Sequence, residues 1–101
     1  MLILNRKPGE IICIEDDSSI TVESVQGRSA RLKIEYKGRQ WGVMVRKGTT
    51  FHLCADINAK ALSVSPYSVE LGIQAPVSVD VDRLEIRERK LREAESKEAK
   101  L

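Results

Sequence analysis

Short segments in which apolar and polar residues alternate recur along this chain and limit the folds open to it. Residues 20–25 read ITVESV and residues 30–36 read ARLKIEY, with Gly27 between them. Such alternation is typical of strands with one buried face, and a glycine suits a hairpin turn. Similar segments are expected at residues 10–15, 40–46, 49–54, 69–74 and 77–83. The sequence predicts a mainly β fold.

The opening segment, residues 1–7, has four apolar residues and ends on Arg6 and Lys7, after which a proline–glycine pair turns the chain. A strand at a chain end frays unless it is tied into a sheet, so we expect it to pair with another segment. Adjacent strand residues point to opposite faces. Arg6 and Lys7 would therefore bring two cations to one sheet edge.

Composition sets the outer limits. With 101 residues we expect one domain with a modest core, which dimerisation would supplement. Cys13 and Cys54 lack metal-binding spacing and are expected to be reduced. No apolar run approaches the roughly 20 residues that cross a bilayer, and no signal-peptide pattern is seen. We predict a soluble, cytoplasmic protein without a membrane partner.

Charge is unevenly spread. Residues 1–27 sum to −3, whereas residues 28–47 hold seven cations against Glu35 alone, although the whole chain is only +2. This excess is typical of a surface for phosphate or another polyanion. A solvated hairpin with charged edges explains it equally well. Counted with Trp41, the candidate accessory RNA-binding residues are Arg28, Arg31, Lys33, Lys37, Arg39, Trp41, Arg46 and Lys47.

Two stretches depart from the strand pattern. Residues 55–62 could start a helix capped by Asp56, but they are too few to stand alone, and we expect irregular structure there. From residue 84 the chain is rich in Glu, Lys, Arg and Ala, and a helix is predicted over about residues 84–98. Its alternating charge favours a role in solubility over nucleic-acid binding.

An enzyme is not expected. His52 is the only histidine, and its neighbours Phe51 and Leu53 suggest a strand. No acid pair, nucleophile constellation, metal spacing or phosphate loop accompanies it. We therefore predict no catalytic residue, no metal, no cofactor and no small-molecule substrate.

Three stretches together resemble the carbon storage regulator family, CsrA/RsmA, whose members are small post-transcriptional RNA-binding proteins. They are the opening MLILNRKPGE, the acidic turn IEDDSSITVESVQG and the closing VELGIQAPVSVDVDRLEIRER. The resemblance covers residues 1 to about 34 and about 69 to 90. Its motifs are specific because a strand, an Ala-Pro break, a V-x-V-x-R strand and a charged helix recur in order.

The resemblance implies a CsrA-like intertwined homodimer in which the first strand of one chain lies beside the last strand of the other. It implies two identical sites that recognise GGA in hairpin loops of mRNA leaders or small RNAs, commonly over a ribosome-binding site, and so a translational repressor. The RNA-binding residues it implies are Leu4, Arg6, Lys7, Gln74, Ala75, Pro76, Val79, Val81 and Arg83.

The chemistry of these positions is sensible in itself. Arginine supplies forked donors to guanine edges or phosphate oxygens, and Arg6 and Arg83 each end a strand. Leu4 and the two valines would form an apolar platform under the bases, or simply pack in the sheet. The backbone of residues 74–76 would read base edges, as in single-stranded RNA loops generally.

The chain also departs from the family pattern. Lys7 stands where a second arginine is usual and lacks its planar fork, Asp82 stands where histidine is common, and Leu84 replaces a glutamate. Residues of about 35–68 are extra and form a β-rich insertion within the single domain 1–101. Residues 20–47 weakly resemble the part from Ile57 to Arg83, so a partial duplication is an alternative. Trp41, in the insertion, would stack on bases or join the core.

Two classes of function follow. In the first, the protein is a dimeric RNA-binding regulator of translation, which Arg6, Arg83 and the basic excess favour. In the second, it is a protein-interaction module that modulates ordinary CsrA-type subunits or another partner, which Lys7, Asp82 and the insertion favour. Tight, salt-sensitive RNA binding would separate the two.

Overall fold

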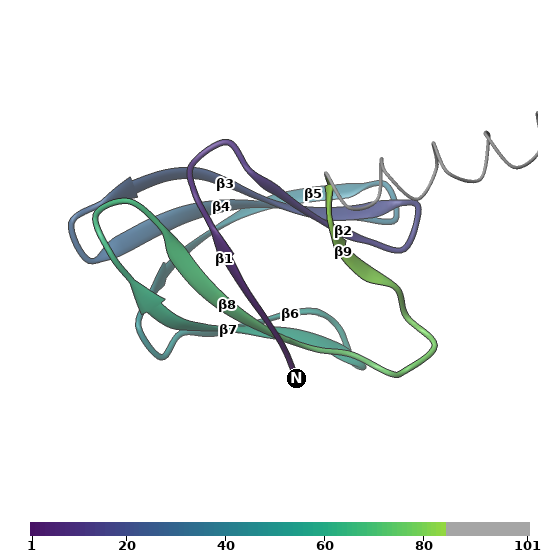
Figure 1. The fold of residues 1–101 in the computed structure, drawn as a ribbon. Helices are drawn as coiled ribbons and strands as arrows, with labels where there is room; N and C mark the ends of the chain where they lie inside the picture. The colour runs from purple at the N-terminus through teal and green to yellow at the C-terminus, as the bar shows by residue number, and fades with distance from the viewer. Residues whose placement is uncertain (85–101) are drawn as a thin grey trace, which may run out of the picture.

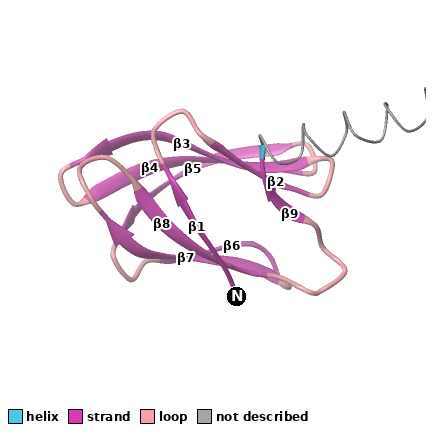
Figure 2. Ribbon diagram, viewed as in Figure 1, coloured by secondary structure: helices cyan, strands magenta, loops and turns pink. Residues whose placement is uncertain are grey.

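The computed structural model describes residues 1–84, apart from the side chain of Arg83, and consists of two antiparallel sheets packed face to face (Figure 1). Figure 2 shows that short loops join the strands. One sheet has the order β1 (Leu2–Arg6), β8 (Val69–Gln74), β7 (Ile57–Val64), β6 (Thr50–Cys54). The other has the order β5 (Arg39–Arg46), β4 (Ser29–Tyr36), β3 (Ser18–Gln26), β2 (Ile11–Ile14), β9 (Val81–Arg83).

Two connections cross between the sheets near the candidate site. β1 lies beside β8, with Leu4 opposite Leu71, and the chain then turns into β2 of the other sheet. At the far end of the chain, β9 leaves β8 and joins the outer side of β2. The β1–β2 turn and β9 therefore meet at the same edge of the larger sheet (Figure 1).

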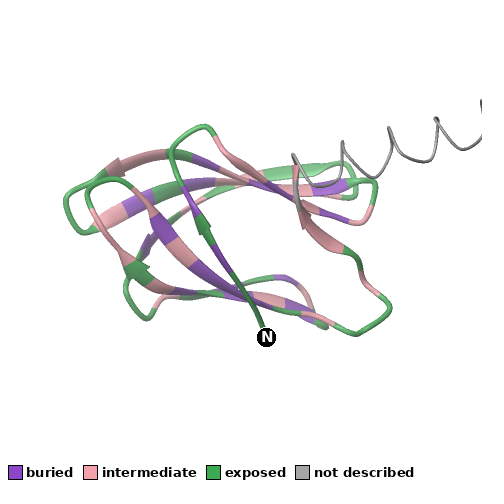
Figure 3. Cartoon of the chain, viewed as in Figure 1, coloured by how far each residue is buried: buried purple, intermediate pink, exposed green. Residues whose placement is uncertain are grey.

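The core lies between the two sheets because each strand buries every second residue, as Figure 3 shows for β4 and β8. Nearly all its members are aliphatic: Leu4, Ile12, Ile14, Ile20, Val22, Ala30, Leu32, Ile34, Val45, Phe51, Leu53, Ile57, Ala59, Ala61, Val69, Leu71 and Ile73. Two buried residues are polar or charged, Ser18 and Arg6. Arg6 is only 3% exposed, which is rare for arginine unless it is paired.

The predicted mainly β fold is confirmed, and so is a positive φ at Gly27, which measures 61°. The prediction of irregular structure over residues 55–62 is wrong. Residues 57–64 form β7, in which Ile57, Ala59 and Ala61 are buried and Lys60 is exposed. Its alternation is carried by alanines, and these suggest a helix in the sequence although here they serve as small core residues.

Three further expectations concern the chain's second half. The last predicted strand, residues 77–83, is reduced to Val81–Arg83, since residues 77–79 form a turn that leaves Val77 in solvent. The predicted helix over about 84–98 lies, beyond Leu84, outside the described residues. The region of about 35–68, predicted to be an insertion, contains the whole of β5, β6 and β7.

Candidate nucleic-acid interface

Arg6, at the end of β1, links that strand to the β1–β2 turn and to β2. Its Nη2 lies 3.2 Å from Oε2 of Glu10, and its Nη1 donates to the Ile11 carbonyl at 3.3 Å. Its Nε donates to the Asn5 carbonyl at 3.1 Å. The other oxygen of Glu10 accepts from the Lys7 amide at 2.7 Å. The guanidinium is therefore oriented by the turn that it closes, and the exposed Lys7 side chain stands beside it.

β9 brings the closing strand to the same place. Arg83 is the partner of Ile12 in the β2–β9 ladder, one residue from the carbonyl that Arg6 contacts. Glu15 fixes the start of β9: its amide donates to the Asp80 carbonyl at 2.8 Å, and its side chain accepts from the Asp80 amide at 3.1 Å. The structure thus brings the guanidinium of Arg6 and the backbone of Arg83 together at β2, within one chain.

The predicted apolar platform is largely turned inward. Leu4 is buried, with 7% of its surface exposed, and Val79 and Val81 are partly buried against the core. These three residues support the strands of the interface. They offer less surface to bases than the sequence suggested.

The predicted backbone contacts at residues 74–76 lie at the other end of β1. Gln74 follows Ile73, the partner of Leu2, whereas Arg6 is paired with Val69. Four residues of strand separate Leu2 from Arg6, or roughly 13 Å. Gln74 and Pro76 are exposed and Ala75 is half-buried. The predicted site residues therefore form an elongated track along β1 and do not converge on one point.

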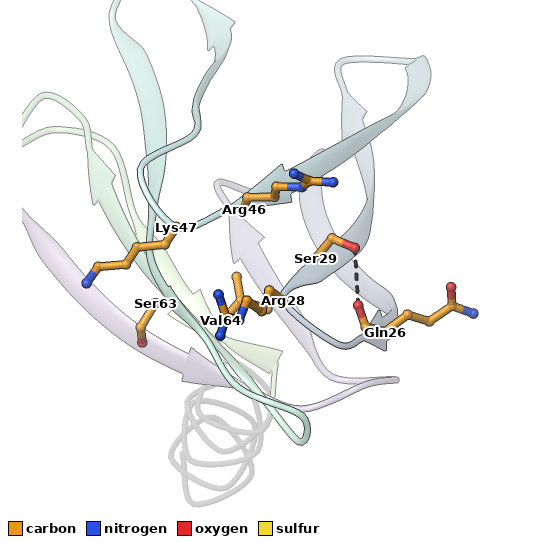
Figure 4. A pocket seen from close by; sticks show the side chains of 7 residues that line it. All are labelled: Gln26, Arg28, Ser29, Arg46, Lys47, Ser63 and Val64. Carbon is orange, nitrogen blue, oxygen red and sulfur yellow. Dashed lines mark hydrogen bonds between the residues drawn. The ribbon is translucent and has the colours of Figure 1, made fainter.

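Three of the predicted accessory cations line a hollow of about 670 Å³ at another corner of the molecule (Figure 4). It is bounded by the β3–β4 turn, the end of β5 and the end of β7. Its lining residues are Gln26, Arg28, Ser29, Arg46, Lys47, Ser63 and Val64. None is a carboxylate, and Arg28, Arg46 and Lys47 are exposed. We call this surface the basic hollow; its chemistry suits a phosphate group.

The remaining accessory residues do not join the basic hollow. Arg31 lines a separate shallow depression with Gly42, Val43 and Met44, and Lys33 pairs with Glu35 at 3.3 Å. Lys37 stands over the Tyr36 ring, 5.6 Å from its centre.

Arg39 and Trp41 line a further hollow, and Trp41 packs partly against the core. Cys54 and Tyr36 line this hollow as well. A hydrogen bond with Tyr36 lowers the pKa of Cys54, and the same bond raises the pKa of Tyr36. Both expectations for Trp41 therefore hold in part, because one side of the indole is packed and the rest faces solvent.

Glu10 is the site residue that sequence reasoning missed. Its carboxylate joins Arg6 to the Lys7 amide, so it shapes the turn on which both cations stand. An Arg-x-x-x-Glu spacing across a proline–glycine turn was the available signal. It was overlooked because such a spacing indicates pairing on a helix, whereas here the turn folds the two residues together.

Paired sheets with cations held at their edges define a β-structured binding protein. The CsrA family model, described as a global regulator protein family, matches residues 1–37. A protein named translational regulator CsrA from Pseudarthrobacter chlorophenolicus is 38% identical over 71 residues, covering 70% of this chain and 88% of its own. A second of that name, from Oleidesulfovibrio alaskensis, is 35% identical over 65 residues, covering 64% and 80%. The chain belongs to the CsrA family.

Membership of this family confirms the prediction of a regulator that is not an enzyme. No solved structure matches the chain significantly. In the part of the chain that the structure describes, no helix is both long and apolar enough to span a membrane. The described residues also contain no cluster of histidine, cysteine and acidic side chains that could hold a metal ion.

Proposed function

We propose that this protein is a cytoplasmic regulator of translation that binds GGA-containing hairpin loops in mRNA leaders or small RNAs and blocks ribosome access. One observation carries the proposal: Arg6 and the backbone of Arg83 meet at β2, at the edge where β1 and β9 approach. Arginine suits guanine edges and phosphates because its planar fork makes two parallel hydrogen bonds.

The division of labour follows from burial. The paired, buried Arg6 holds the β1–β2 turn in shape and presents Lys7 beside it. Arg83 would supply the forked donor to the RNA, and exposed Gln74 and Pro76 would line the far end of the track. The basic hollow would hold phosphates of the hairpin stem without reading sequence.

A gel-shift titration with a GGA hairpin tests the proposal, run at 50 and 200 mM salt and repeated with the loop changed to CCA. Arg83→Ala should weaken binding about 10- to 100-fold, which corresponds to loss of one bidentate contact. The control is Lys60→Ala, which removes an exposed cation from β7 and should change affinity less than twofold. Equal binding to both loops, or an unaffected Arg83→Ala variant, would contradict GGA recognition.

The second candidate, a protein-interaction module, is favoured by one feature. Among the described strands, β6 pairs only with β7, whereas its counterpart edge on β2 is covered by β9. A partner strand added to β6 would use a common mode of recognition. Absence of RNA binding, together with co-purification of a family member through β6, would favour this function over the first.

A further inference from the structure

The strands β1–β4 and β5–β8 repeat one another with a constant offset of 39 residues. Gly9 in the β1–β2 turn corresponds to Gly48 in the β5–β6 turn, and their φ angles are 88° and 93°. Each of these turns leads into a three-strand meander, β2–β3–β4 in one case and β6–β7–β8 in the other. The match of the family model to residues 1–37 ends where the first of these units ends.

The register of the sheets obeys the same offset. Leu4 pairs with Leu71 and, 39 residues on from Leu4 and back from Leu71, Val43 pairs with Leu32. The irregularity in the β3–β4 ladder lies between Val22 and Ser24, and that in the β7–β8 ladder between Ala61 and Ser63. Because a bulge is a specific departure from regular pairing, its recurrence at matching positions indicates one backbone plan used twice.

The turns repeat their hydrogen bonds as well. The Gly9 amide donates to the Val22 carbonyl at 2.7 Å, and the Gly48 amide donates to the Ala61 carbonyl at 2.7 Å. Two more bonds recur: Glu10 N to Lys7 O at 3.0 Å with Thr49 N to Arg46 O at 2.9 Å, and Val22 N to Glu10 O at 3.1 Å with Ala61 N to Thr49 O at 2.9 Å. The two turns are thus built from the same bonds.

The sequence carries a trace of the repeat. Identical residues stand at Gly9/Gly48, Asp17/Asp56, Ser24/Ser63, Val25/Val64, Ser29/Ser68, Leu32/Leu71 and Ile34/Ile73. Core positions stay apolar but change size, as in Ile12/Phe51 and Ile20/Ala59. Such exchanges are tolerated when total core volume and pattern are kept.

The two units exchange their first strands inside the chain. β1 lies in the sheet formed by β6–β8, and β5 lies in the sheet formed by β2–β4. We infer that this chain is a fused pair of family units that builds one complete RNA site by itself, without a strand from a second copy. This inference rests on the proposed function for the identity of the ligand.

The repeat also shows why there is one site and not two. At the second turn, Val45 takes the place of Arg6 and Thr49 the place of Glu10. Only the first unit's edge strand, β2, is covered by β9; among the described strands nothing covers β6. The second end keeps the scaffold and the nearby basic hollow, but it lacks both the arginine and the closing strand.

A disulfide trap tests the exchange without RNA. In a Cys13→Ser/Cys54→Ser background, the pair Asn5→Cys/Glu70→Cys joins β1 to β8 at residues that are partners in the ladder. Partners in antiparallel strands lie about 4.5–5.5 Å apart, within reach of a disulfide. The control, Thr21→Cys/Lys33→Cys, joins β3 to β4 of one hairpin. After oxidation with diamide, both pairs should migrate as single chains on a non-reducing gel.

Linked two-chain species from the 5/70 pair, or its failure to close while the control closes, would overturn the inference. A complementation arm then uses the GGA hairpin. Arg6→Val and Arg83→Ala chains are unfolded together and refolded, and the mixture should bind within twofold of the weaker binding of the single variants. Recovery of tight binding would show a site shared between two copies. If the wild-type chain binds no hairpin, the proposed function fails, while the disulfide trap still decides the exchange.

Discussion

The β1–β2 and β5–β6 turns have the same backbone and different chemistry. The first places a buried guanidinium against Glu10 and the Ile11 carbonyl, and the second places Val45 and Thr49 at the matching positions. The hydrogen bonds of the two turns agree to within 0.2 Å. The comparison teaches that the fold depends on the strand exchange and the glycine turns, whereas binding depends on a few side chains that one unit has kept.

Position 6 and position 45 are both buried, at 3% and 0% exposure, so each end has solved the same burial problem differently. A buried arginine needs partners for its donors, and Glu10 with two backbone carbonyls supplies them. A valine needs none. Once the second unit has lost its arginine, no selection for a carboxylate at residue 49 is expected, and threonine there still accepts from the Arg46 amide at 3.0 Å.

The largest effect is expected from Val45→Arg. It would bury a guanidinium where the matching carboxylate is absent, and an uncompensated buried charge costs about 3–5 kcal/mol. Urea denaturation followed by circular dichroism should show a correspondingly lower midpoint. Adding Thr49→Glu should recover part of the loss. A Val45→Arg variant as stable as the wild type would show that the two positions are not equivalent.

The reverse exchange, Arg6→Val, should affect binding more than folding. Valine fits a buried strand position, so the unfolding free energy should fall by no more than about 2 kcal/mol. Hairpin affinity should fall about tenfold or more, because Lys7 and the turn lose their anchor. Gel shift and urea denaturation on the same preparation separate the two quantities. Unchanged affinity in this variant would remove Arg6 from the interface.

Gly9→Ala and Gly48→Ala should cost similar amounts. Both residues have φ near 90° and open space around the added methyl, so only backbone strain opposes alanine. That strain is about 1–2 kcal/mol. Denaturation midpoints that differ between the two variants by much more than the measurement error would break the structural equivalence of the two turns.

The basic hollow should contribute least, and without regard to sequence. Arg46→Ala/Lys47→Ala removes two of its three cations. If both touch phosphates, the slope of log K against log salt should become shallower by about 1.4, or 0.7 per contact on single-stranded RNA. Binding to GGA and CCA loops should fall by the same factor. An unchanged slope would leave the hollow outside the RNA path.

Much of this fold is predictable from local pattern. Alternating segments mark most strands, and Gly27 marks its turn. β7 was missed because its core residues are mainly alanines, and the pairing of β1 with β8 was missed because the register between distant segments has no local signal. The 39-residue repeat keeps few identities, so it is visible chiefly in the ladders and turn bonds.

Within the site, the sequence indicated the two arginines but not the burial of Arg6 or its partnership with Glu10. It also grouped cations that the fold separates, since Lys33 and Lys37 lie away from the basic hollow. Nearness along the chain implied one charged patch. Strand alternation and the turn at residues 37–38 direct these side chains to different surfaces.

The mass of the RNA complex tests the central claim most directly. Native mass spectrometry with excess GGA hairpin should show one chain of 11.3 kDa bound to one hairpin. A complex of two chains with two hairpins would contradict the account, since it would mean that strands from separate copies still build the site.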